Sequence, residues 1–207
     1  MIELPARPLL ILISAPSGGG KTTLCERLVA EFDFLTYSVS CTTRSPREGE
    51  VDGTDYYFLT ETEFDQRVRA GEFLEHALVH GHRYGTLKKV ITEGFQQGRD
   101  ILMDIDVQGA QQIRRQIDQC SPGDPLRRGL VDIFIAPPSI EVLRKRLQGR
   151  GKDAADVIER RVQMAENELP HWREYQYLII NDRLDASYDA LRAILLAEHR
   201  RVMGDAT

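Results

Sequence analysis

Short, nearly continuous apolar runs recur along the 207-residue chain, separated by stretches with helical spacing. The clearest of these runs are Leu9–Ile13, Ile101–Ile105, Val131–Ile135 and Tyr177–Ile180. Strands that are apolar throughout are typical of parallel sheets, because such strands are buried on both faces. The runs therefore predict the strands of a parallel sheet.

Between these runs, apolar residues recur three and four positions apart, which indicates amphipathic helices. The predicted helices are Thr22–Glu31, Gln108–Ile117, Ile140–Gln148, Ala154–Leu169 and Leu184–Arg201. An alternation of strands and helices is typical of an α/β fold in which helices cover a parallel sheet.

The alternation breaks between about Leu35 and Gly98. Strand signals near Tyr56–Leu59 and Phe73–Val79 look antiparallel and half exposed, and two helices are predicted here. The first begins at a capping box made by Thr60 and Glu63 and runs to about Ala70. We interpret the region as an insertion packed beside the main sheet. The segment Ser121–Pro125 reads as a loop by its composition.

A glycine-rich segment joins the first apolar run to the first helix: Ser14-Ala15-Pro16-Ser17-Gly18-Gly19-Gly20-Lys21-Thr22-Thr23. Consecutive glycines allow backbone N–H groups to face an anion, and the helix start adds unpaired donors. Lys21 can then reach the outer phosphates of a nucleotide, and a hydroxyl after it can hold Mg²⁺. The segment matches the pattern G-x-x-x-x-G-K-[ST] except at Ala15. Three glycines followed by Lys-Thr-Thr disfavour the alternative of a turn that binds nothing.

Two carboxylates, Asp104 and Asp106, stand at the end of the second apolar run. Ligands of open α/β sheets bind at this edge, and an Asp beside a phosphate-binding loop supports Mg²⁺. A period of two would point both side chains to the same face. The alternative is an aspartate that caps the following helix.

Arginines, tyrosines and a glutamate in the insertion can together bind a nucleotide. Arg44 and Arg47 can form bidentate pairs with a phosphate, which tyrosine hydroxyls can support. Glu75 could accept two hydrogen bonds from the adjacent N–H donors of guanine, an edge that adenine lacks. The remaining candidates are Ser40, Tyr56, Tyr84 and Thr86. Their spacing leaves open the alternative that they are scattered surface residues.

The composition argues against nucleic-acid-binding, membrane and secreted proteins. A net charge of −5 and a sequence pI near 5.6 argue against a general nucleic-acid binder, which normally carries a basic face. No apolar run approaches the about 20 residues needed to span a bilayer, and no signal peptide is visible. Three cysteines without C-x-x-C spacing read as reduced thiols. We therefore expect a cytoplasmic protein without a membrane partner.

Many basic residues surround Gly149 and Gly151, which lie between two predicted helices. Glycines flanked by helices are typical of the hinges of a moving flap. The alternative is a solvated helical face that carries many charges.

Several segments, in this order, resemble the guanylate kinase family, whose phosphate loop admits Ala or Gly at the position of Ala15. They are Ser14–Lys21, Ser40–Glu50, Asp52-Gly53-x-Asp55-Tyr56, Asp104–Gly109, Ile135–Ser139, Arg146–Gly151 and Asn181-Asp182. The resemblance covers Leu9 to about His199. It implies a P-loop α/β/α fold of three layers with a parallel sheet. It also implies a CORE at 1–35, 99–139 and 171–207, a mixed α/β GMP-binding region at 36–98 and a helical LID at 140–170.

The resemblance further implies a kinase of purine metabolism that transfers the γ-phosphoryl group of MgATP to GMP, and to dGMP. Implied ATP contacts are Ala15, Pro16, Ser17, Gly18, Gly19, Gly20, Lys21, Thr22, Thr23, Arg146 and Asn181. Implied GMP contacts are Ser40, Arg44, Arg47, Tyr56, Glu75, Tyr84, Thr86, Asp104 and Asp106. Implied catalytic residues are Lys21, Arg44, Arg150 and Arg161. Thr22 or Thr23 and Asp104 would support Mg²⁺, partly through water.

Two other classes of function compete with this reading. A phosphopeptide-binding module of the same fold would have a degraded phosphate loop, whereas Gly20, Lys21 and both threonines are present here. A related kinase for a small sugar phosphate is disfavoured by four residues that together argue for a guanine nucleotide: Ser40, Arg44, Tyr56 and Glu75. The sequence leaves open whether the protein is a monomer or a homo-oligomer.

Overall fold

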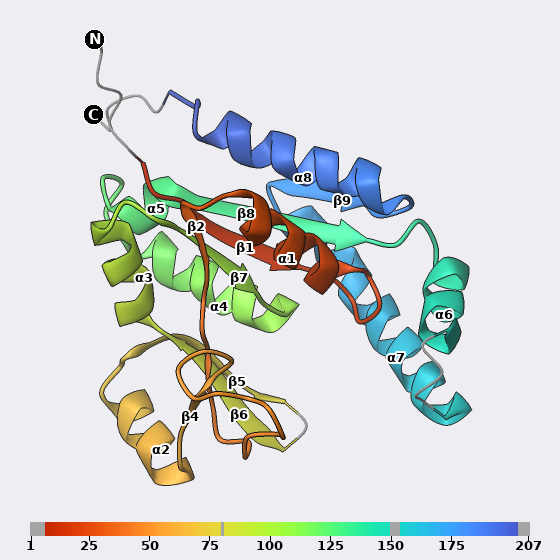
Figure 1. Ribbon diagram of the computed structural model, residues 1–207, viewed down its shortest axis with the longest axis horizontal. Helices are drawn as coiled ribbons and strands as arrows, with labels where there is room; N and C mark the ends of the chain where they lie inside the picture. The colour runs from red at the N-terminus through yellow and green to blue at the C-terminus, as the bar shows by residue number, and fades with distance from the viewer. Residues whose placement is uncertain (1–6, 80, 150–153, 203–207) are drawn as a thin grey trace.

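The computed structural model describes residues 7–79, 81–149 and 154–202, and a five-stranded parallel sheet forms its centre (Figure 1). The strand order is β2-β7-β1-β8-β9. These strands are β1 (Leu10–Ser14), β2 (Leu35–Tyr37), β7 (Asp100–Asp104), β8 (Leu130–Ala136) and β9 (Tyr177–Ile180). β1 is buried along its whole length and pairs in parallel with β7 and β8. The predicted parallel sheet is confirmed.

Helices cover both faces of this sheet, as the alternating pattern predicts. Alternate residues of β1 face opposite sides, so that Ile11 packs with α1 (Lys21–Glu31) and α8 (Leu184–Glu198), whereas Leu12 packs with α3 (Lys88–Gln96) and α4 (Val107–Asp118). The result is a three-layer α/β/α arrangement. α8 ends three residues before the predicted Arg201. No helix in the described ranges is long and apolar enough to cross a membrane.

The insertion forms a second sheet with the order β4-β3-β6-β5. Its elements are β3 (Cys41–Thr42), β4 (Tyr57–Phe58), α2 (Glu61–Arg69), β5 (Phe73–Val79) and β6 (His82–Leu87). The capping box at Thr60 and the antiparallel pairing of β5 with β6 are confirmed. The antiparallel expectation for the strand near Tyr56–Leu59 is wrong, because β4 pairs with β3 in parallel. The long loop between them carries the chain back, so both strands run in the same direction.

The predicted GMP-binding region, residues 36–98, includes residues at both of its ends that pack with the main sheet. β2 pairs with β7 of the main sheet, so Thr36 and Tyr37 belong to that sheet. α3 lies before residue 98 and packs on β7, where Gly94 leaves room for Ile101. The three-residue β2 is too short to show a periodic pattern.

Two helices follow β8 and pack mainly on each other. α6 (Ile140–Gly149) and α7 (Ala155–Glu168) share an apolar cluster that includes Leu143, Leu147 and Val162. Figure 1 shows the pair beyond the arrowhead of β8, to one side of the main sheet. The 3-10 helix η1 (Leu169–Glu174) leads from the pair to β9. The expected loop before β8 ends in a short helix, α5 (Pro125–Gly129).

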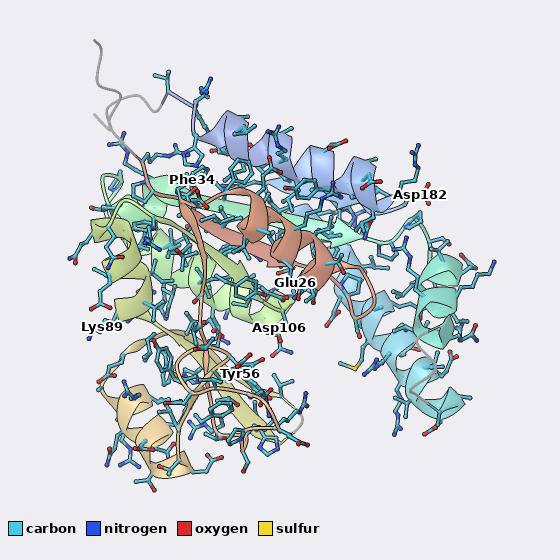
Figure 2. All side chains as sticks on the ribbon, in the orientation of Figure 1. Glu26, Phe34, Tyr56, Lys89, Asp106 and Asp182 are labelled. Carbon is cyan, nitrogen blue, oxygen red and sulfur yellow. The ribbon has the colours of Figure 1, made fainter. Side chains whose placement is uncertain are left out.

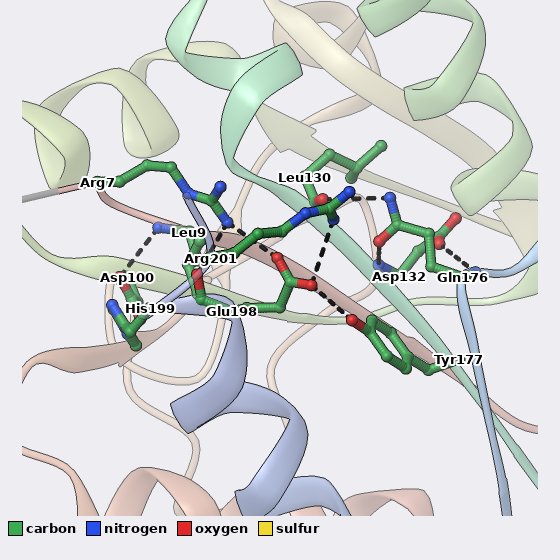
Figure 3. Close-up of polar contacts among 10 residues, drawn as sticks. All are labelled: Arg7, Leu9, Asp100, Leu130, Asp132, Gln176, Tyr177, Glu198, His199 and Arg201. Atoms are coloured by element: carbon green, nitrogen blue, oxygen red, sulfur yellow. Dashed lines mark hydrogen bonds and ion pairs between the residues drawn. The ribbon is translucent and has the colours of Figure 1, made fainter. Parts of the chain in front are cut away.

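Buried carboxylates hold the chain at the amino ends of the strands (Figure 3). Asp100, only 2% exposed, accepts a hydrogen bond from the backbone N–H of Leu9 at 2.9 Å and contacts Nε2 of His199 at 2.7 Å. Glu198 accepts hydrogen bonds from Nη2 of Arg7 at 2.9 Å and from the hydroxyl of Tyr177 at 2.5 Å. These contacts fasten the end of α8 to the sheet, far along the strands from the glycine-rich loop.

Asp132 makes a third contact of this kind within β8. It is 2% exposed and accepts hydrogen bonds from the backbone N–H of Gln176 at 2.8 Å and from Nη1 of Arg114 at 2.9 Å. The backbone N–H of Asp132 in turn donates to Oε1 of Gln176 at 3.1 Å. A buried carboxylate is tolerated only when such partners replace water.

We expect Asp132→Ala to lower the free energy of unfolding by about 2–4 kcal/mol, because it leaves a partly buried guanidinium and a partly buried N–H without this partner. Urea unfolding followed by circular dichroism measures the change. Asp185→Ala is the matched control, since Asp185 pairs with Arg27 on the exposed surface, and its loss should be much smaller. Equal losses in the two variants would contradict the assigned role of Asp132.

Candidate functional site

The glycine-rich loop turns sharply from β1 into α1 at the carboxyl edge of the main sheet. Gly18 and Gly20 have φ values of 88° and 91°, a region that residues with a Cβ rarely adopt. Gly20 is the N-cap of α1, and no side chain caps this helix. The first N–H groups of α1 are therefore available to an anion, as a phosphate-binding loop requires.

Asn181 and Arg146, which the family resemblance places near adenine, both connect to this loop. Nδ2 of Asn181 donates to the carbonyl oxygen of Gly19 at 2.8 Å, and a Cβ at Gly20 would clash with the same nitrogen. Nη2 of Arg146 donates to the carbonyl oxygen of Asn181 at 2.8 Å. These bonds join α6, the end of β9 and the glycine-rich loop. A contact of either side chain with adenine stays a prediction.

The structure brings Lys21 and Asp104 together. β1 and β7 pair with Ile13 beside Asp104, so the loop after β1 starts next to this carboxylate. The Lys21 ammonium forms an ion pair with Asp104 and donates to the carbonyl oxygen of Ile105 at 3.2 Å. The predicted phosphate-binding lysine and the predicted Mg²⁺-supporting carboxylate therefore share one site.

A cavity of about 530 Å³ lies between this edge of the sheet and the insertion. Both sides contribute predicted site residues: Thr22 and Asp104 from the main sheet and its helix, and Ser40, Tyr56, Glu75 and Thr86 from the insertion. The hydroxyls of Ser40 and Thr86 are 3.4 Å apart. Figure 2 shows Tyr56 on the side of the insertion that faces Glu26 and Asp106. These candidates are thus gathered around one cavity and are not scattered over the surface.

Glu75 lies on β5 beside Thr86 and is 7% exposed. Burial raises the pKa of Glu75 to about 7, and the charge of Asp106 adds to this rise, while hydrogen bonds with Thr86 oppose it. A buried carboxylate without a cationic partner gains most from a ligand that offers N–H donors. The group is therefore suited to a ligand with two adjacent N–H donors.

Arg44, Tyr56 and Tyr84 form a second group next to the cavity. The guanidinium of Arg44 lies 5.4 Å from the ring centroid of Tyr56, and the rings of Tyr56 and Tyr84 lie 5.9 Å apart. Arg44 is paired with Glu50, and the backbone N–H of Arg47 donates to the same glutamate at 2.7 Å. Three of the four predicted phosphate-binding residues therefore have side chains in contact, and Arg47 joins them through its backbone.

Of three other predicted residues, Asp106 and Arg161 are not among those that line the cavity, and Arg150 is not described. Asp106 caps α4, accepting a hydrogen bond from the backbone N–H of Gly109 at 2.8 Å. This is the capping alternative, and it turns the carboxylate toward the helix, so its contact with GMP stays a prediction. Arg161 lies on α7. Arg150 lies outside the described residues, and the catalytic roles of both arginines also stay predictions.

The sequence did not single out several residues that line the cavity. They are Glu26 on α1, Tyr37, Ser38 and Val39 after or at the end of β2, and Thr54 before Tyr56. Burial raises the pKa of Tyr37, and the charge of Asp104 raises it further. Tyr37 and Ser38 lie at the carboxyl end of β2, where ligands of such sheets bind. The sequence could not identify them on this basis, because a strand of three residues gives no periodic signal.

Thr22 and Asp104 fit a magnesium ion by their chemistry. Both line the cavity and both offer oxygen ligands. Within the described ranges, no three His, Cys, Asp or Glu side chains are grouped to hold a metal ion. Mg²⁺ commonly takes only one or two protein oxygens and completes its shell with phosphates and water.

Comparison with known proteins agrees with this geometry. The family model for guanylate kinase matches residues 7–198. A guanylate kinase of Cereibacter sphaeroides is 47% identical over 195 residues, covering 94% of this chain and 89% of that protein. One from Geobacter metallireducens is 46% identical over 193 residues, covering 93% and 90%.

A solved structure is similar over almost the same length. The crystal structure of guanylate kinase from Anaplasma phagocytophilum aligns with a TM-score of 0.73 at 32% sequence identity, covering 96% of this chain and 90% of that one. Matches of this extent include the glycine-rich loop, the insertion and the cavity between them. The chain belongs to the guanylate kinase family.

Proposed function

We propose that the protein transfers the γ-phosphoryl group of ATP to GMP, and to dGMP, giving ADP and GDP. The observation that carries the proposal is the single cavity that joins a phosphate-binding helix start to a buried carboxyl suited to guanine. Thr22 and Asp104 line this cavity from the main sheet and its helix, and Glu75 lines it from the insertion. Membership of the guanylate kinase family supports the same reaction.

ATP would bind with its phosphates on the glycine-rich loop. The N–H groups at the start of α1 and Lys21 would hold the outer phosphates. The Lys21 ammonium has three N–H groups, of which Asp104 and Ile105 engage two. The third can donate to a phosphate oxygen while the ammonium stays paired with Asp104.

Mg²⁺ would be held by Thr22 or Thr23 and by Asp104, partly through water. When bound, it neutralises the charge that spreads over the transferred phosphoryl group. Asp104 would then serve both Lys21 and the ion.

GMP would bind in the insertion. Guanine would donate its two adjacent N–H groups to Glu75, with Ser40 and Thr86 completing the contacts to the base. Its phosphate would lie among Arg44, Arg47, Tyr56 and Tyr84. Adenine would leave Glu75 without donors, and a buried polar group left unpaired rejects the wrong substrate strongly.

Positioning and charge would account for catalysis, since phosphoryl transfer needs no covalent nucleophile. Holding two nucleotides in line can supply about 7–11 kcal/mol of the barrier. Lys21 would stabilise the developing charge together with Arg150 and Arg161 of the 140–170 region. α6 and α7 share their own apolar cluster, which supports assigning this region as a lid that moves as a unit and excludes water.

In a coupled spectrophotometric assay, we expect MgATP to release ADP when GMP is present. We expect no ADP release when GMP is replaced by AMP or UMP, or when water is the only acceptor. Lys21→Ala should lower turnover by about a hundredfold or more, because it removes a cation from the transferred phosphoryl group. Lys89→Ala on the exposed face of α3 is the control, and it should retain wild-type turnover. Folded wild-type protein that releases no ADP with GMP would contradict the proposed reaction.

The affinity for GMP should fall as the pH falls below about 7. The carboxyl of Glu75 has a pKa of about 7, so acid protonates it and removes an acceptor from guanine. The KM for GMP should then rise by up to about tenfold per pH unit, while the KM for ATP does not follow this titration. Steady-state kinetics between pH 5.5 and 8 measure both constants.

Glu75→Gln is the control for this titration, because the phosphate of GMP itself titrates near pH 6 and that change remains in the variant. The variant should bind GMP poorly at pH 8 and lose the part of the pH dependence due to Glu75. Since burial raises the pKa of Glu75, the wild type without GMP should lose stability as pH rises from about 4.5 to 7, and Glu75→Gln should not. Identical pH profiles in the two proteins would rule out this role.

A further inference from the structure

Glu50 has no role in the reaction described so far, yet it contacts both arginines expected at the GMP phosphate. It lies in the loop between β3 and β4. Its Oε1 accepts a hydrogen bond from Nη2 of Arg44 at 2.8 Å, and its Oε2 accepts one from Nη1 at 2.9 Å. Oε2 also accepts the backbone N–H of Arg47 at 2.7 Å. One carboxylate therefore holds a guanidinium and a backbone segment at once.

The ion pair between Arg44 and Glu50 is held in place by burial and by the backbone. The side chains of Arg44 and Glu50 are only 11% and 19% exposed. The backbone N–H of Glu50 donates to the carbonyl oxygen of Arg47 at 3.1 Å, which closes a tight turn. Arg44 and then the Arg47 N–H lower the pKa of Glu50 to about 2, so the carboxylate is charged at any working pH. A carboxylate tied to the backbone in this way cannot swing away as a gate would.

The hydrogen bonds of Arg44 leave part of its guanidinium for a ligand. Nη1 uses both its N–H groups, one on Glu50 and one on the carbonyl oxygen of Ser45 at 2.8 Å. Nη2 uses one on Glu50. A guanidinium has five N–H groups, so one on Nη2 and one on Nε remain. Two parallel donors on one edge match two oxygens of a phosphate.

We propose that Glu50 is a positioning residue for the phosphate of GMP. It holds the end of the Arg44 guanidinium so that the Nε and Nη2 edge stays directed at the substrate, and it fixes the turn that carries Arg47. An arginine without such a partner loses its rotamer freedom when it binds, which weakens binding. This inference rests on the proposed function, because it concerns the phosphate of the same acceptor nucleotide.

The test is Glu50→Gln, which keeps the shape of the side chain but removes its charge and one acceptor. The dissociation constant and the KM for GMP should rise about tenfold or more, as expected for the loss of charge-assisted hydrogen bonds. The KM for ATP should stay unchanged. Inhibition by guanosine, which lacks the phosphate, should also stay unchanged, because Glu75, Ser40 and Thr86 are untouched. A general disturbance of the loop would weaken guanosine and GMP alike.

Glu72→Gln is the matched control. Glu72 pairs with Arg67 at 3.0 Å in the same insertion, and neither residue lines the cavity. This variant should bind GMP and guanosine like the wild type. In an Arg44→Ala background, Glu50→Gln should have a clearly smaller effect on GMP than in the wild type, since Glu50 acts mainly through Arg44.

Three results would overturn the inference. Tighter binding of GMP by Glu50→Gln would show that Glu50 competes with the phosphate. Equal weakening of GMP and guanosine would show a structural role only, and unchanged binding of GMP would show no role. Turnover of GMP by the wild type separates these results from the proposed function: if the wild type neither binds nor phosphorylates GMP, the reaction and the inference both fail.

Discussion

The burial of β1 between β7 and β8 is the constraint on which the rest of the structure depends. Every residue of β1 is buried, and alternate side chains enter apolar clusters on opposite faces of the sheet, so a slip in register would exchange the two clusters. The register in turn sets Ile13 beside Asp104. Parallel strands have their carboxyl ends at the same edge of the sheet. The strands themselves therefore place the glycine-rich loop, Asp104 and Asn181 at that edge.

Two of the cations expected at a phosphate, Lys21 and Arg44, are already paired with a carboxylate of the same chain. Lys21 contacts Asp104, and Arg44 contacts Glu50. Such pairs keep partly buried cations satisfied, and they also limit the directions in which the cations can point. Neither pair uses all the donors of its cation, so a phosphate can join each pair without breaking it. The two carboxylates carry the same sign of charge as a phosphate and would repel it. In this site, however, they hold the cations in the positions where a phosphate can contact them.

The sequence predicted the parallel sheet, its helices and the glycine-rich loop because each has a local signal: continuous apolar runs, helical spacing, and glycines before Lys21. It could not reveal β2, whose three residues are too few for a period, or the parallel pairing of β3 with β4, which depends on the path of a long loop. Asp106 satisfied two local patterns, and the capping contact with Gly109 is the one observed. That Ser40, Glu75 and Thr86 meet in one cavity follows from the second sheet, which single-residue spacing does not encode.

The insertion shifts the pKa values of two glutamates, Glu75 and Glu50, in opposite directions. Burial raises the pKa of Glu75 to about 7, and no described residue forms an ion pair with it, whereas Arg44 and a backbone N–H lower the pKa of Glu50 to about 2. Glu75 is buried with hydrogen bonds from Thr86 alone, so a ligand that supplies further N–H donors relieves its desolvation directly. Glu50 already accepts three hydrogen bonds from Arg44 and Arg47, and it would affect a ligand by ordering these two residues. Recognition of the base would thus come from a buried carboxyl that gains N–H donors from the ligand, and recognition of the phosphate from a charged carboxylate that keeps its arginine in place.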